Sequence, residues 1–148
     1  MSPRGLRLPG LALLLGLAPL AFVHPVRIQG RSMVPLLRDG DLRLALRAWC
    51  AGRARTGQVW LASSPSGIVV KRLAAGPGSR VELRDGELWV NGQYVQEPYL
   101  HDTERASCGP WDTGRGWFLL GDNRQESHDS RAWGPLPAGS LEARVLLP

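Results

Sequence analysis

The sequence predicts an all-β protein: one antiparallel, curved or barrel-like β domain preceded by a single N-terminal transmembrane helix. Its 148 residues suffice for one domain of ordinary size. Glycine (18) and proline (12) make up about a fifth of the chain, which favours short strands and many turns over long helices. The 43% apolar and 21% charged content excludes wholesale disorder and a polytopic membrane protein.

An uncharged apolar stretch over 8–26 follows a short basic N-terminus. Its length approaches the roughly 20 residues that a membrane-spanning helix needs. Because Arg4 and Arg7 precede it, we expect 1–7 in the cytoplasm, 8–26 as a transmembrane signal-anchor in the cell membrane and 27–148 as an extracytoplasmic β domain. A cleaved signal peptide fits the same pattern, although the small residues that mark a cleavage site are poorly placed. We favour the retained anchor over the leader, and a buried core helix is the third alternative.

Strand and turn signals alternate along the rest of the chain. Leucines at every second position over 41–47 indicate a half-buried strand. Asp85-Gly86 and Asn91-Gly92 are strong hairpin signals and predict a meander of three short strands. The other expected strands lie at 58–62 and 68–73, which form a hairpin, and at 117–120 and 143–147. The polar segment 97–116 is expected to be a loop or excursion.

The net charge of +5 and the pI near 10.2 raise nucleic acid as a partner. However, the arginines are scattered from Arg4 to Arg144 without a basic run, and acidic residues lie among them. This distribution favours a solvated surface, so we expect no nucleic-acid partner. A basic β-barrel whose six tryptophans stack on single-stranded nucleic acid remains an alternative from a different functional class.

The sequence contains no pattern typical of a metal site. Cys50 and Cys108 lack the spacing of a zinc site, and the three histidines are scattered. We therefore expect no structural metal. Whether the two cysteines form a disulfide depends on their distance and on the redox compartment, and both possibilities stay open.

Lysine is almost absent from this chain. Of the 18 basic residues, 17 are arginine and only Lys71 is lysine. An arginine stays protonated at any workable pH, whereas burial can neutralise a lysine. The single lysine therefore indicates a position where a neutral amine is required, with chance survival as the alternative.

Three motifs surround this lysine in the sequence. They read G-R-S-M-V-P at 30–35, V-K-R at 70–72 and G-D-N-R-Q-E-S-H-D-S-R-A-W-G at 121–134. In this order they resemble the motifs of bacterial type I signal peptidases, the membrane-bound serine proteases of family S26 with a Ser-Lys dyad. The resemblance covers about 30–137, and the apolar segment before it agrees with the family's membrane anchor.

The resemblance implies a role for each matching residue. Ser32 would be the nucleophile and Lys71 its general base, which requires that burial lower the pKa of the amine. Ser127 would orient the amine. Asp129 and Arg131 would pair with each other and hold their loop beside the site.

Further residues of the motifs would support this dyad. Asp122 and Arg124 belong to the turn that would place Ser127. Some relatives carry a hydroxyl two residues before the nucleophile to stabilise the oxyanion, but this chain has Gly30 there. Met33 would line the substrate groove, with core packing as the alternative.

By this resemblance the protein would be a serine endopeptidase that removes signal peptides from exported preproteins at the outer face of the membrane. It would need neither a metal nor a cofactor, because the lysine amine provides the proton transfers. Its expected partners are those preproteins and membrane lipid. Within the family, a maturation peptidase dedicated to one exported protein is the nearest alternative. Self-cleaving repressors also use Ser-Lys chemistry, but the apolar N-terminus and the lack of a helical DNA-binding domain oppose that interpretation.

Overall fold

Antiparallel strands form two sheets in the computed structural model, which describes residues 21–100 and 105–147. The larger sheet has the strand order β1-β2-β11-β3-β4-β9-β10, and the smaller has the order β7-β6-β5-β8. The all-β prediction is thereby confirmed. The strands are β1 (Val23–Arg27), β2 (Leu42–Arg47), β3 (Val59–Ser64), β4 (Gly67–Ala75), β5 (Arg80–Arg84), β6 (Glu87–Val90), β7 (Gln93–Tyr94), β8 (Cys108–Asp112), β9 (Gly116–Leu120), β10 (Leu136–Pro137) and β11 (Leu141–Val145).

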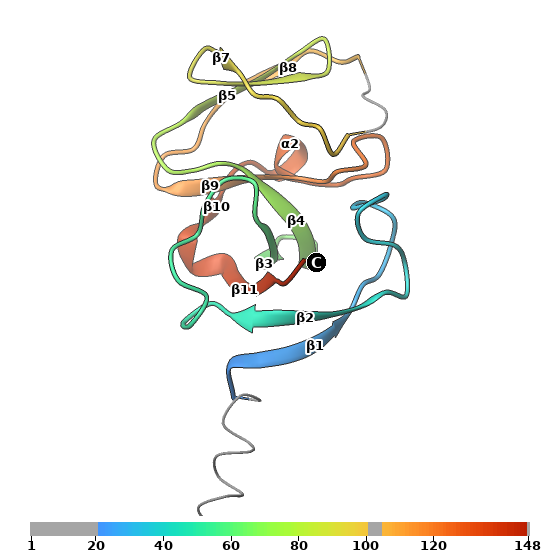
Figure 1. The fold of residues 1–148 in the computed structure, drawn as a ribbon. Coiled ribbons are helices and arrows are strands. Elements are labelled where there is room, and N and C mark those ends of the chain that lie inside the picture. The colour runs from blue at the N-terminus through green and yellow to red at the C-terminus, as the bar shows by residue number, and fades with distance from the viewer. Residues whose placement is uncertain (1–20, 101–104, 148) are drawn as a thin grey trace, which may run out of the picture.

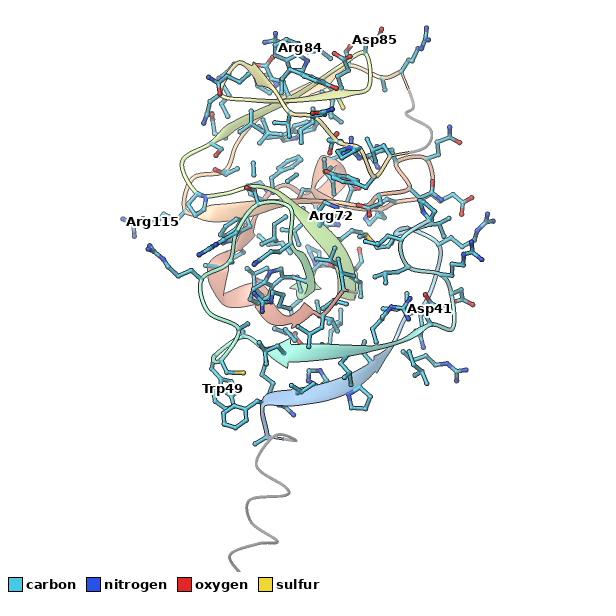
Figure 2. The ribbon with its side chains drawn as sticks, viewed as in Figure 1. Asp41, Trp49, Arg72, Arg84, Asp85 and Arg115 are labelled. Carbon is cyan, nitrogen blue, oxygen red and sulfur yellow. The ribbon has the colours of Figure 1, made fainter. Side chains whose placement is uncertain are left out.

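The small sheet lies at one end of the molecule and the first strands of the larger sheet, β1 and β2, at the other (Figure 1). Strands β4 and β9 lie between them (Figure 1). Trp49, directly after β2, therefore lies far from Arg84 and Asp85, which belong to the small sheet (Figure 2). The short helix α2 (Ser130–Trp133) lies between β9 and the small sheet (Figure 1). Its place matters because the preceding loop carries several of the motif residues.

The core follows from the apolar residues that these strands bury. One cluster joins β1, β2, β3 and β11 to the long connection after β1, a second lies around β3, β4 and β9, and a third joins β4 and β9 to the small sheet. Burial of such side chains is the main driving force for folding. Fully buried members include Leu37, Trp60, Leu73, Val81 and Phe118.

The hairpin signals of the sequence are confirmed. Asp85 and Asn91 have positive φ values of 50° and 53°, and each is followed by a glycine that also has positive φ. This pair of left-handed residues is what a two-residue hairpin turn requires. The turns join β5 to β6 and β6 to β7 in antiparallel register.

Two predictions about individual segments were wrong. The helix predicted over 8–26 does not extend to residue 26, because Val23–Arg27 forms strand β1 and pairs with β2. Pro25 is tolerated there since β1 is an edge strand. The segment 97–116 is not only a loop, because Cys108–Asp112 pairs with β5 as the edge strand β8. Both strands are short and lie at sheet edges, where a partner strand rather than the local pattern decides the structure.

Residues 8–20 of the predicted anchor, and the segment 1–7, lie outside the described residues. Among the residues that the structure describes, no helix has the length and apolar character needed to cross a membrane.

Candidate active site

Ser32 lies in the long connection between β1 and β2. The next residue, Met33, is buried at 2% exposure, and its carbonyl oxygen accepts a hydrogen bond from the amide of Leu37 at 2.9 Å. Leu37 is itself fully buried. The two apolar side chains anchor the turn in the core, while Ser32 stays half-buried and available at its edge.

Lys71 reaches this serine from strand β4. Its Nζ lies 2.6 Å from Ser32 Oγ and 3.1 Å from the carbonyl oxygen of Val70. Only 4% of the lysine is exposed, and apolar core residues flank it along the strand. The structure therefore brings together the two residues, 39 positions apart, that the sequence predicted as a pair.

The surroundings of Lys71 lower the pKa of its amine below the ordinary value of 10.5. Burial is the largest cause, because a charged ammonium loses its hydration there. The carboxylates of Asp129 and Asp122 oppose this shift, while the nearby guanidinium of Arg131 supports it. The shift makes the neutral amine, which is the form that accepts a proton, more accessible than it is for a lysine in water.

The turn after β9 holds the backbone of Ser32. The amide of Asn123 donates to the carbonyl oxygen of Ser32 at 2.9 Å, and its side-chain Nδ2 donates to the carbonyl oxygen of Arg31 at 3.2 Å. Gly121 makes this approach feasible, because a Cβ there would lie 2.6 Å from the Ser32 carbonyl oxygen and 2.5 Å from Ser127 Cβ. A residue with a side chain would push the turn away from Ser32.

Ser127 lies next to this glycine, but its predicted contact with the lysine is not formed. The hydrogen bonds of the Lys71 amine go to Ser32 and Val70. Ser127 Oγ is buried and has no hydrogen-bond partner among the described residues. Its role in orienting the amine stays a prediction.

Asp129 and Arg131 pair as expected. The Arg131 guanidinium lies 2.8 Å from Asp129 Oδ1 and also donates to the carbonyl oxygens of Arg124 and Ser127, at 2.7 and 3.0 Å. Asp129 is 1% exposed, caps helix α2 through the amide of Arg131, and accepts a hydrogen bond from the amide of Gly121 at 3.0 Å. The pair thus joins the helix to the Ser127 loop and to the turn that contacts Ser32.

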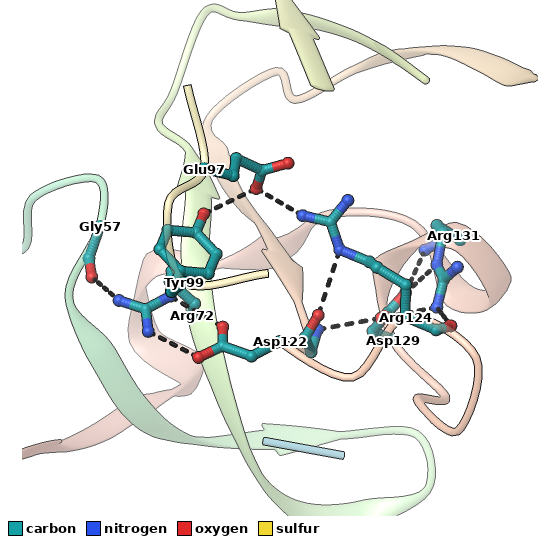
Figure 3. A network of polar contacts seen from close by, with 9 residues as sticks. Gly57, Arg72, Glu97, Tyr99, Asp122, Arg124, Asp129 and Arg131 are labelled. Atoms are coloured by element: carbon teal, nitrogen blue, oxygen red, sulfur yellow. Dashed lines mark hydrogen bonds and ion pairs between the residues drawn. The ribbon is translucent and has the colours of Figure 1, made fainter. Parts of the chain in front are cut away.

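A second buried ion pair ties β4 to the same turn. Arg72 donates to both carboxylate oxygens of Asp122, at 2.8 and 2.6 Å, and to the carbonyl oxygen of Gly57 at 2.6 Å (Figure 3). A bidentate pair of this kind fixes orientation as well as distance. Because Arg72 follows Lys71 directly, the pair sets the position of the turn relative to the lysine strand.

The sequence did not identify two partners of this network, Glu97 and Tyr99. Arg124 lies in the turn as predicted, donates to the Gly121 carbonyl oxygen at 3.1 Å and forms a buried ion pair with Glu97 (Figure 3). Tyr99 donates to the same carboxylate at 2.6 Å, and its ring lies 3.9 Å from the Arg72 guanidinium carbon. Both residues belong to a segment expected to be an irregular loop, and no local pattern marks them.

The family model described as "Signal peptidase, peptidase S26" matches residues 6–148 of this chain. The chain belongs to the signal peptidase family. Signal peptidase I of Bacillus licheniformis is 33% identical over 136 residues, which cover 82% of this chain and 73% of that protein. Thylakoidal processing peptidase 1 of Arabidopsis thaliana is 30% identical over 139 residues, which cover 84% of this chain but only 41% of the plant protein.

A solved signal peptidase structure agrees with this membership. The crystal structure of a signal peptidase I from Enterococcus faecalis V583 is 29% identical and matches with a TM-score of 0.53, covering 64% of this chain and 97% of that one. The fold therefore also corresponds to that of a signal peptidase.

The surroundings of Met33 and Gly30, two predicted supporting residues, refine what the sequence predicted for them. Met33 packs with Ile28 and Leu37 in the core, which agrees with the alternative prediction of core packing rather than with a position in the substrate groove. Gly30 has positive φ, and its amide donates to Asp39 Oδ1 at 2.8 Å, so it is engaged in the turn. No group of three or more His, Cys, Asp or Glu among the described residues is placed to hold a metal ion.

Proposed function

We propose that this protein is a serine endopeptidase that removes signal peptides from exported preproteins, with Ser32 as nucleophile and Lys71 as general base. The observation that carries the proposal is the 2.6 Å contact between Ser32 Oγ and the buried amine of the chain's single lysine. A serine hydroxyl is a weak nucleophile until a neighbouring base removes its proton. Membership of the signal peptidase family and the names of the relatives support the choice of substrate.

The chemistry requires only these two side chains and water. The neutral Lys71 amine takes the Ser32 proton while Oγ bonds to the scissile carbonyl carbon, and the resulting ammonium gives that proton to the leaving amine. An ester between Ser32 and the signal peptide remains. Lys71 then deprotonates a water molecule that attacks the ester, and the proton returns to Ser32 Oγ as the peptide departs.

The neighbouring groups supply positioning and charge stabilisation. The backbone N–H of Ser32 would donate to the oxyanion, whereas the amide of Gly30 is engaged by Asp39 and Gly30 has no hydroxyl to add. Ser127 Oγ, buried and without a hydrogen-bond partner in the described part of the chain, would accept from the amine once the substrate fills the site. That contact would direct the lone pair of Lys71 toward Ser32.

The β1–β2 end of the molecule supports a position at the membrane surface. Leu42 and Leu44 on β2 are 68% and 53% exposed, and Trp49 is 68% exposed and packs against Phe22 at a ring distance of 5.2 Å. Apolar and aromatic side chains gathered at one surface are typical of contact with lipid. We infer that this end faces the outer leaflet, where a preprotein presents its cleavage site.

The proposed activity is tested by incubating the detergent-solubilised protein with a model preprotein and sequencing the N-terminus of the product. We expect a single cut after the signal peptide and none with Ser32→Ala, which removes the attacking oxygen but keeps the turn. Cleavage by a folded Ser32→Ala protein would refute the nucleophile. Cleavage of one exported protein and of no general preprotein would instead indicate a dedicated maturation peptidase.

The membrane position is tested in proteoliposomes that contain the same preprotein. Leu44→Glu should slow cleavage there while leaving cleavage of a short soluble peptide unchanged. Tyr94→Glu is the matched control, because Tyr94 is also 53% exposed but lies in the small sheet at the other end. Equal effects of the two substitutions would exclude the β1–β2 end as the lipid contact.

A further inference from the structure

The segment that leaves the small sheet makes a buried polar contact with the catalytic region. The side chains of Glu97 and Arg124 are only 5% and 3% exposed. The Glu97 carboxylate accepts hydrogen bonds from the Tyr99 hydroxyl and from the Arg124 guanidinium. Burial and the adjacent Glu97 raise the pKa of Tyr99, so its hydroxyl stays protonated and donates. The carboxylate is therefore the fixed point to which both neighbours are attached.

Tyr99 also contacts the ion pair next to the lysine. Its ring lies 3.9 Å from the guanidinium carbon of Arg72, and a ring face attracts a cation at this distance. The guanidinium is held on its other sides by Asp122 and by the Gly57 carbonyl oxygen. Removing the ring would leave one face of this buried arginine without a partner.

These contacts converge on the turn that holds Ser32. Asp122 lies between Gly121, where an added Cβ would collide with Ser127 and Ser32, and Asn123, whose amide donates to Ser32. Arg124 holds the carbonyl oxygen of Gly121. A shift of this turn would therefore move the serine relative to the lysine strand.

We propose that Tyr99, anchored by Glu97, is a positioning residue that locks the Arg72–Asp122 pair and thereby sets the geometry between Ser32 and Lys71. It acts through Arg72 and the turn and does not touch the reacting atoms. This inference rests on the proposed function, because it concerns the same dyad, and it adds the segment after β7 as a support of the active site.

The single lysine gives a readout of this geometry that does not depend on activity. Protein grown with lysine carrying ¹³C at Cε shows one signal, because Lys71 is the only lysine in the chain. Its titration reports the amine directly. The charged and hydroxyl groups around it are Ser32 from the β1–β2 connection, Asp122 from the turn after β9, and Asp129 and Arg131 from the start of α2.

The test compares the full-length wild type with Tyr99→Leu and Tyr99→Phe. Tyr99→Leu should lower kcat on a preprotein about tenfold with KM nearly unchanged, since small displacements of reacting groups are costly. Water admitted to the loosened site should also move the Lys71 titration to higher pH. Tyr99→Phe keeps the ring over Arg72 and should lose only about twofold to threefold in kcat.

Tyr94→Leu is the matched control, because Tyr94 is an exposed tyrosine of the small sheet that contacts Trp89. It should leave kcat and the lysine titration unchanged. A folded Tyr99→Leu protein with wild-type kcat and an unmoved lysine signal would overturn the proposal. The proposal would also be overturned if the loss of kcat in Tyr99→Leu were fully explained by the fraction of unfolded protein, while the Lys71 titration of the folded molecules matched that of the wild type.

Two further outcomes keep the test decisive. If Tyr99→Leu does not fold, Tyr99→Phe carries the test through hydrogen exchange of the Asn123 amide, which should speed up several-fold. Unchanged exchange together with unchanged kcat would overturn the proposal. If the wild type cleaves no preprotein, the proposed function fails, but the lysine titration still decides whether Tyr99 positions the site.

Discussion

The amide of Asn123 donates to the carbonyl oxygen of Ser32 at 2.9 Å, across 91 positions of sequence. This bond attaches the backbone of the proposed nucleophile to the turn that also carries Gly121 and Asp122. Asp122 is in turn bound to Arg72, the residue after Lys71. The serine and the lysine are thus connected through the backbone and a buried ion pair in addition to their own contact.

Gly121→Ala should lower kcat/KM about 100-fold, because the new Cβ would lie 2.6 Å from the Ser32 carbonyl oxygen and must displace it. Gly139→Ala is the control, since a Cβ there meets nothing within 4 Å. Steady-state kinetics on a preprotein, with circular dichroism to verify folding, measures both. Equal activity of the two variants would show that the turn does not set the position of Ser32.

Lys71→Arg should abolish turnover, because a guanidinium stays protonated and cannot accept the Ser32 proton. In the wild type, the neutral fraction of the amine grows as pH rises through its pKa. Because burial lowers this pKa, activity should reach half its maximum below pH 10.5. An active Lys71→Arg variant, or a wild-type rate that rises only near the ordinary lysine pKa, would falsify the neutral-lysine mechanism.

Lys71→Met should stabilise the fold at acidic pH by about 1–3 kcal/mol while removing activity, because it replaces a buried amine by an apolar side chain of similar length. The folded-state pKa of Lys71 lies below its unfolded value. Between these two values the unfolded chain binds more protons, so wild-type stability rises with pH and the advantage of methionine shrinks. Urea denaturation at about pH 6 and about pH 9 tests this sign. A gap that widens with pH would contradict it.

Asp122→Asn should destabilise the protein by about 3–5 kcal/mol, because it leaves the buried Arg72 guanidinium without its counter-charge. The matched control is Glu82→Gln. Glu82 also bonds to two arginines, Arg80 and Arg84, but on the solvent-exposed face of the small sheet, where ion pairs contribute little. Thermal unfolding of both variants checks the difference, and equal shifts in Tm would argue against a special role for the buried pair.

Most of the strands could be predicted from the sequence, because neighbouring residues alone carry the alternation and turn signals that mark them. Alternating leucines marked β2, and the Asp-Gly and Asn-Gly pairs marked the turns of the small sheet with their positive φ values. Strands β1 and β8 were missed because each is an edge strand whose residues are all half-buried or exposed. Such strands form when a partner offers its free edge, and the partner is distant in sequence.

The sequence by itself determined the residues on which the proposed chemistry rests: one lysine among 17 arginines, and a serine in a motif that resembles those of the signal peptidase family. Only the tertiary structure decided the environment that makes this chemistry workable. It buried Lys71 against Ser32, tied both to the turn through Asn123 and Arg72, and added the carboxylate of Glu97 from the segment beyond the small sheet. The physical reason is that residue types and local spacing are written in the chain, whereas burial, which lowers the pKa of Lys71, and contacts across tens of residues exist only once the sheets have packed.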